Sequence, residues 1–131
     1  MNIQGQTAIV TGGGSGLGEA VAHELARQGA KVAVIDVNAA NAERVAAAIG
    51  GIALTADITD TASLTAALDA AEAQVGVARI VMNIAGIGTA KRVLAKDGSP
   101  APLEEFERVI RVNLLAQVCH LMPNLSIEST T

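Results

Sequence analysis

The amino-acid sequence predicts an α/β protein with a Rossmann-like, doubly wound parallel sheet. Short β-rich runs alternate with longer alanine-rich helical runs along the 131 residues of the chain. Consecutive parallel strands need crossover helices, which pack on both faces of the sheet. Half of the residues are hydrophobic but only 1% are aromatic. This aliphatic composition suits helices that pack closely on buried strands.

The first half of the chain contains two predicted strand–helix units. Residues 7–11 form an apolar strand, a glycine-rich turn follows, and apolar residues at helical spacing predict a helix over 17–28. Gly29 ends this helix. The second strand covers 31–36, and the second helix covers 38–49 and is followed by two glycines.

A third unit and a fourth strand follow. The third strand is expected over 52–57, and Asp60 or Thr61 caps a helix that runs to about Val75. The fourth strand covers 78–83. Strands separated by helices in this way make all four strands parallel neighbours in one sheet.

The last part of the chain contains a long loop and one more helix. The loop covers 86–102, and the helix covers 103–122 and is stopped by Pro123. We therefore expect one dinucleotide-binding domain over 1–123 and an irregular tail over 124–131. The fold is expected to be truncated after the fourth strand and its following helix.

Composition and charge exclude several function classes. Nine basic and 13 acidic residues give a net charge of −4, and there is no Trp or Tyr. The chain therefore offers neither a basic surface nor a base-stacking platform, and nucleic acid is not an expected partner. Cys119 is the single cysteine, so we expect no disulfide framework and no metal site. No signal peptide and no run of about 18 apolar residues is present, which predicts a cytoplasmic protein without a membrane partner.

The turn before the first helix has the residues that a pyrophosphate requires. A pyrophosphate must approach the backbone closely, so Cβ atoms are excluded at Gly12 and Gly16, and the helix N-terminus offers free N–H donors. Gly18 lets the helix pack tightly against the first and fourth strands. A flexible glycine-rich loop is the alternative. The predicted phosphate site comprises Gly12, Ser15, Gly16, Leu17 and Gly18.

Asp36 ends the second strand about twenty residues beyond the turn, where a carboxylate accepts hydrogen bonds from the adenosine ribose. It also repels a 2′-phosphate, and the neighbouring Ser15 and Val37 supply no positive charge. This predicts NAD rather than NADP as the cofactor. The alternative is that Asp36 is a turn former or helix cap. Asp57, at the end of the third strand, can accept from the adenine amino group, with Ile58 beside it in the predicted cofactor site.

Together with Asn113 and the Asn-Ile-Ala-Gly run at 83–86, these motifs resemble the short-chain dehydrogenase/reductase family. The Thr-Gly-x-x-x-Gly-x-Gly turn is similar to the family's nucleotide turn, and 83–86 resembles its Asn-Asn-Ala-Gly motif. The resemblance implies that Asn83 steadies the sheet and that Ala85 and Gly86 line the cofactor. It also implies that Asn113 belongs to the catalytic tetrad, where its backbone carbonyl holds a water.

The stretch 87–115 resembles type 2 3-hydroxyacyl-CoA dehydrogenases more closely. The basic pair Lys91-Arg92, an extended Lys-Asp-Gly loop and residues 103–109 carry this resemblance. It implies NAD-dependent oxidation of the 3-hydroxyl of acyl-CoA thioesters or of a related secondary alcohol. A small-molecule substrate and a homo-oligomer are the partners that the resemblance implies.

The catalytic part of the family pattern is missing. Hydride transfer in this family needs a tyrosine as general acid/base, a lysine four residues later and a serine that orients the substrate. The chain has no tyrosine, and Lys31, Lys91 and Lys96 lie outside the expected place of the lysine. Asn113 is therefore the one tetrad member present, and we expect this chain alone to be inactive. Cys119 and His120 are adjacent on the predicted helix and point about 100° apart, which argues against a nucleophile pair.

Three hypotheses stay open. The chain is an NAD-dependent short-chain dehydrogenase in truncated form, a non-catalytic NAD-binding module, or an S-adenosylmethionine-dependent methyltransferase domain. The position of Gly18, the motif at 83–86 and Asn113 argue against the methyltransferase. An open strand edge at 80–82 and apolar side chains around much of the last helix predict self-association.

Overall fold

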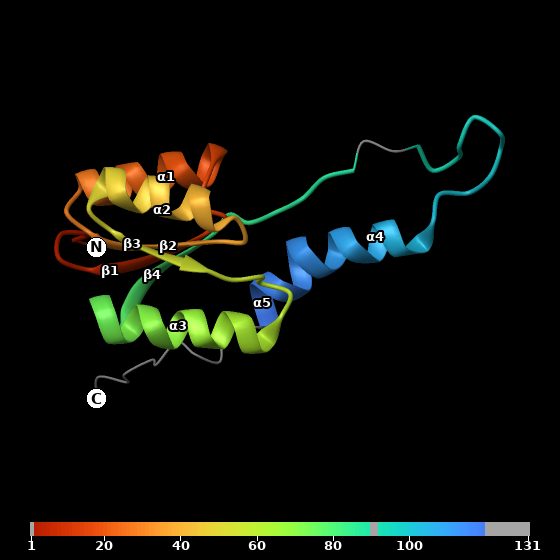
Figure 1. Cartoon of the computed structure of the whole chain (residues 1–131). Helices are drawn as coiled ribbons and strands as arrows, with labels where there is room; N and C mark the ends of the chain where they lie inside the picture. Colours follow the sequence, from red (N-terminus) through yellow and green to blue (C-terminus); the bar gives the residue numbers. More distant parts are fainter. Residues whose placement is uncertain (1, 90–91, 120–131) are drawn as a thin grey trace.

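The computed structural model describes residues 2–89 and 92–119, and it confirms the α/β fold class. One parallel sheet has the strand order β3-β2-β1-β4. The strands are β1 (Thr7–Thr11), β2 (Lys31–Asp36), β3 (Ile52–Thr55) and β4 (Ala78–Asn83). The chain moves outward from β1 to β3 and then returns to place β4 on the other side of β1 (Figure 1). Ligands bind at such a reversal, at the carboxyl ends of the strands.

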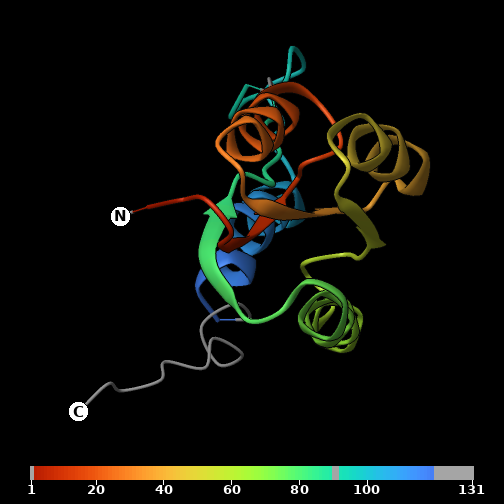
Figure 2. The ribbon, with the colours of Figure 1, turned by 90° about the vertical axis from the view of Figure 1, so that its left-hand side faces the viewer.

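The helices cover both faces of the sheet. They are α1 (Gly16–Arg27), α2 (Ala39–Ile49), α3 (Thr61–Val75), α4 (Leu103–Ile110), the π-helical turn η1 (Arg111–Leu115) and α5 (Ala116–Cys119). Figure 2 shows α1 and α2 on one face of the sheet and α3 on the other. This is the layered arrangement that the alternating pattern of strands and helices predicts.

Strand β2 lies in the centre of the hydrophobic core. Val32 and Val34 pack in the cluster that α1 and α2 cover, whereas Ala33 and Ile35 pack in the cluster on the α3 face. All four side chains are at most 1% exposed. Burial on both faces explains why this strand is a continuous apolar run rather than an alternating one.

Most predicted boundaries agree with the structure to within one residue. Asn38 and Asp60 are the N-caps of α2 and α3, because their side chains accept hydrogen bonds from Asn41 N and Ser63 N. Strand β3 is shorter than expected and ends at Thr55. Beyond it the chain makes one more backbone bond to β2 and then forms a turn.

The helix predicted over 103–122 continues through its described residues to Cys119, and η1 is a π-helical turn within it that the sequence did not predict. The end of that helix, Pro123 and the predicted tail 124–131 lie outside the described residues, as does Lys91. The loop before α4 extends away from the sheet, and α4 returns toward it (Figure 1). Helix α4 has no buried residue, so it adds little to the core.

Candidate functional site

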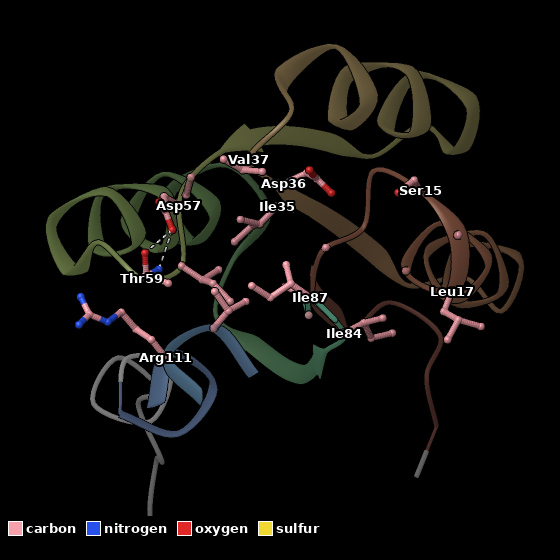
Figure 3. A pocket seen from close by; sticks show the side chains of 18 of the residues that line it. Ser15, Leu17, Ile35, Asp36, Val37, Asp57, Thr59, Ile84, Ile87 and Arg111 are labelled. Carbon is pink, nitrogen blue, oxygen red and sulfur yellow. Dashed lines mark hydrogen bonds between the residues drawn. The ribbon is translucent and has the colours of Figure 1, made fainter. Parts of the chain in front are cut away.

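A groove of about 610 Å³ lies at the carboxyl ends of the strands. Figure 3 shows side chains from several elements that point into it. The glycine turn and the start of α1, the ends of β2, β3 and β4, and the α4–η1 segment all contribute to its wall. The predicted cofactor residues that line it are Gly12, Ser15, Gly16, Leu17, Gly18, Asp36, Asp57, Ile58, Ala85 and Gly86.

Two glycines let the turn lie directly against its neighbours. Gly12 has a φ of +67°, and an added Cβ would lie 2.6 Å from the Cα of Ala85. At Gly18 an added Cβ would lie 2.0 Å from the carbonyl oxygen of Gly12. The atoms nearest to Gly18 belong to the turn that directly follows β1, and the predicted packing of the helix against the first and fourth strands stays a prediction. Side chains at either position would displace the backbone that shapes the groove.

The N-terminus of α1 faces the groove. Its N-cap, Ser15, is extended and makes no side-chain capping hydrogen bond. Leu17, in the first turn, is 80% exposed and also lines the groove. The first N–H groups of a helix have no partner within the helix. The start of α1 can therefore donate to an anion in the groove.

Asp36 is held at the edge of the groove by two backbone N–H groups. Its Oδ2 accepts from Gly14 N at 2.9 Å, and its Oδ1 accepts from Asn38 N at 2.9 Å. The bond from Asn38 is the strand-end turn that the sequence offered as an alternative role. The hydrogen bond from Gly14 attaches the carboxylate to the glycine turn. Asp36 therefore has both roles: it forms the turn at the end of β2, and it lines the groove.

Arg44 is a basic residue near this acid that the sequence reasoning missed. Its Nη2 donates to the carbonyl oxygen of Gly14 at 3.1 Å, and its guanidinium pairs with both carboxylate oxygens of Glu19 at 2.7 and 2.9 Å. The hydrogen bond from Arg44 lowers the pKa of Glu19. No local spacing signals this pair, because the two residues lie 25 positions apart on different helices.

Asp57 and Thr59 form a polar corner at the end of β3. Asp57 Oδ1 accepts from the Thr59 hydroxyl at 2.7 Å and from Thr59 N at 2.8 Å. Both hydrogen bonds lower the pKa of Asp57, and the one from the hydroxyl has the larger effect. Arg108 and Arg111 also line the groove, and Figure 3 shows Arg111 on the same side as Thr59. Sequence reasoning assigned neither arginine nor Thr59 to the site.

Asn113 and Asn83 lie outside the residues that line the groove. Asn113 Oδ1 accepts from Ile87 N, and its Nδ2 donates to Ile87 O, both at 2.8 Å. Asn83 Nδ2 donates to the carbonyl oxygen of Gln117 at 3.5 Å. The Gln117 side chain in turn donates to the carbonyl oxygen of Ala85. These bonds attach the segment after β4, which lines the groove, to η1 and α5.

No helix within 2–89 and 92–119 is long and apolar enough to cross a bilayer. In the same residues, no group of three or more His, Cys, Asp or Glu side chains is arranged to hold a metal ion.

Comparison with known proteins gives consistent matches. The family model for short chain dehydrogenases matches residues 6–125. D-threitol dehydrogenase of Mycolicibacterium smegmatis is 37% identical over 117 residues, which cover 86% of this chain and 43% of that protein. Human 3-hydroxyacyl-CoA dehydrogenase type-2 is 35% identical over 117 residues, which cover 87% of this chain and 45% of that protein.

A solved structure matches the fold as well. The crystal structure of a 3-ketoacyl-(acyl-carrier-protein) reductase from Brucella melitensis, complexed with NADH, has a TM-score of 0.84 and 39% sequence identity. The match covers 95% of this chain and 50% of that one. The chain thus spans half or less of the length of these proteins. Because the family match extends over nearly the whole sequence and the fold agrees with it, this chain belongs to the short-chain dehydrogenase family.

Proposed function

We propose that the groove binds NAD(H) and that the chain is an NAD(H)-binding member of the short-chain dehydrogenases. The observation that carries this proposal is Asp36, whose carboxylate is fixed at the groove edge by the N–H of Gly14. A carboxylate in this position favours a ribose with a free 2′-hydroxyl over one with a 2′-phosphate. The Brucella melitensis reductase, which was solved with NADH, supports the same cofactor.

The residues present fit this cofactor. Cβ atoms at Gly12 or Gly18 would overlap backbone, so glycine at these positions lets the turn lie close to Ala85 and to α1, and the N–H groups at the start of α1 can donate to a pyrophosphate in the groove. Asp36 would accept from the ribose hydroxyls, and Asp57 would accept from the adenine amino group. The carboxyl group of Asp57 is ionised at neutral pH, and the hydrogen bonds from Thr59 lower its pKa further, so both of its oxygens are acceptors. When bound, NAD(H) supplies the hydride chemistry of the family.

The substrate class that we propose is a secondary alcohol, with 3-hydroxyacyl-CoA as the first candidate. The resemblance of 87–115 supports it, and the two relatives described above are by name dehydrogenases of D-threitol and of 3-hydroxyacyl-CoA, which both carry hydroxyl groups. The chain has no tyrosine, so no phenol is available as general acid/base. We therefore propose that this chain, by itself, binds NAD(H) but does not catalyse hydride transfer. The proposed role of Asn113 as a member of the catalytic tetrad is unchanged. The homo-oligomer and the cytoplasmic location stay predictions.

NADH titration tests the cofactor proposal. The chain has no Trp or Tyr, so the fluorescence of NADH itself or calorimetry provides the signal. We expect Asp36→Ala to weaken NADH binding about tenfold, the value of one hydrogen bond to a charged group. The same substitution should also reduce the difference between the affinities for NADH and NADPH. Asp69→Ala, an exposed acid on α3, is the matched control. Equal affinity of the unmodified chain for both cofactors would contradict the proposal.

A turnover assay tests the catalytic part separately. Purified chain with NAD and 3-hydroxybutyryl-CoA is expected to form no NADH, because loss of a general acid/base alone removes a factor of about 10²–10⁴ in rate. Turnover at a rate typical of a dehydrogenase would refute the non-catalytic proposal and leave the binding proposal intact.

A further inference from the structure

Hydrogen bonds link Asp36 to Arg44 through one residue of the turn. Gly14 N donates to Asp36 Oδ2 at 2.9 Å, and the carbonyl oxygen of the same glycine accepts from Arg44 Nη2 at 3.1 Å. A positive charge therefore lies only one residue's backbone away from the carboxylate at the groove edge. Arg44 is nevertheless not among the residues that line the groove.

Glu19 holds this guanidinium in its place. Arg44 Nη1 and Nη2 donate to the two oxygens of Glu19 at 2.7 and 2.9 Å, which is a bidentate pair. The side chain of Arg44 is 55% exposed and that of Glu19 is 27% exposed. A half-exposed arginine on a long stem has room to move once its partner is removed. While the pair is intact, its charges offset each other, and Asp36 contributes an unbalanced negative charge.

We propose that the Glu19–Arg44 pair is a second determinant of cofactor choice in this chain, acting together with Asp36. Asp36 repels a 2′-phosphate, and Glu19 retains Arg44, which would otherwise bind that phosphate. The inference rests on the proposed binding of NAD(H) in the groove. It assigns Glu19 and Arg44 to specificity, although neither residue lines the site.

The two effects are predicted to be non-additive. Removing only the acid at Asp36 leaves Arg44 paired with Glu19, so little cation is available to the phosphate. Removing only Glu19 releases Arg44 but leaves the repulsion by Asp36. With both acids removed, Arg44 can donate two hydrogen bonds to the 2′-phosphate, the geometry that guanidinium groups favour.

A set of variants tests this coupling through the affinities for NADPH and NADH. The double variant Asp36→Ser/Glu19→Gln should gain more NADPH affinity than the two single variants together. We expect its fold-gain to exceed the product of the two single fold-gains by about tenfold, which is the value of one hydrogen bond to a charged group. Adding Arg44→Met should remove that excess. Glu24→Gln is the matched control, because Glu24 forms a 2.7 Å ion pair with Arg27 near the other end of α1. It should change neither affinity.

The outcomes separate the two proposals. This inference would be overturned if the fold-gain in NADPH affinity of the double variant equalled the product of the two single fold-gains. It would also be overturned if the excess remained after Arg44→Met was added. Either result would show that the Glu19–Arg44 pair only joins α1 to α2. Arg44→Met added to Asp36→Ser alone gives a second route: NADPH affinity should stay unchanged, and a loss would show that Arg44 is not retained by Glu19. If the unmodified chain binds no NADH, the proposed function fails first, and this inference fails with it.

Discussion

Replacing Gly18 with alanine tests the backbone packing that shapes the groove. In an unobstructed helical position, alanine would stabilise the protein by about 0.5–1 kcal/mol relative to glycine. In α1, however, the added Cβ would lie 2.0 Å from the carbonyl oxygen of Gly12 and 2.9 Å from the Cα of Gly13. These are backbone atoms, so no side-chain rotation can relieve the overlap.

The size of the overlap gives the expected magnitude. Carbon and oxygen atoms in contact are normally about 3.3–3.6 Å apart, so α1 and the turn must separate by about 1.3–1.6 Å. Overpacking costs about 1–3 kcal/mol, and an overlap of this size between backbone atoms belongs in the upper half of that range, about 2–3 kcal/mol. After the gain in helix propensity is subtracted, the net loss of stability is about 1–2.5 kcal/mol. We expect NADH affinity to fall about tenfold or more, because the N–H donors of the turn move with it.

Thermal melts and NADH titration of Gly18→Ala measure both effects. Gly88→Ala is the matched control, because an added Cβ there would meet no atom within 4 Å and Gly88 has no positive φ. It should change neither the melting temperature nor the affinity. A Gly18→Ala variant as stable as the unmodified chain, with unchanged NADH affinity, would refute the packing argument.

Two further predictions concern pH and association. The hydrogen bond from Arg27 is the largest cause that lowers the pKa of Glu24 from 4.5 to about 2. The stabilising effect of this hydrogen bond is full above pH 4.5 and is lost as the pH falls toward 2. Glu24→Gln should therefore lower the free energy of unfolding at pH 7, and its difference from the unmodified chain should shrink in acid. A difference that stays constant with pH in denaturant titrations would contradict this. Phe106 is 63% exposed on α4, and exposed apolar side chains promote association. Phe106→Ser should therefore raise the monomer fraction measured by light scattering, compared with the control Glu107→Ser. Equal monomer fractions in the two variants would argue against association through this face.

The strands and the first three helices could be predicted because their signals are local. Buried parallel strands are continuous apolar runs, and Asn38 and Asp60 mark helix starts through bonds that span three residues. The π-helical turn at η1 could not be predicted in this way. The side chain of Asn113 in η1 binds the backbone of Ile87, 26 positions away, and such a partner is set by the tertiary structure.

The same distinction applies to the site. The glycines of the turn, Asp36 and Asp57 follow from motif spacing, because each lies at the carboxyl end of a strand. Arg44 reaches the turn from α2, and Arg108 and Arg111 reach the groove from the α4–η1 segment. No short spacing encodes these approaches, since they depend on how whole helices pack. Apart from Thr59, which follows β3, the polar residues that were missed are therefore charged side chains that distant helices supply.

The π-helical turn can absorb a change in chain length without turning the helix that follows it. A π-turn contains about one residue more than an α-turn, so deleting one residue within Arg111–Leu115 would restore regular α-helical spacing. Because the extra residue belongs to the same turn of the helix, α5 would keep the side that it presents to the sheet, and Gln117 would still face Ala85. A deletion in the regular part of α4 would instead rotate the first residues of α4 relative to α5 by about 100°.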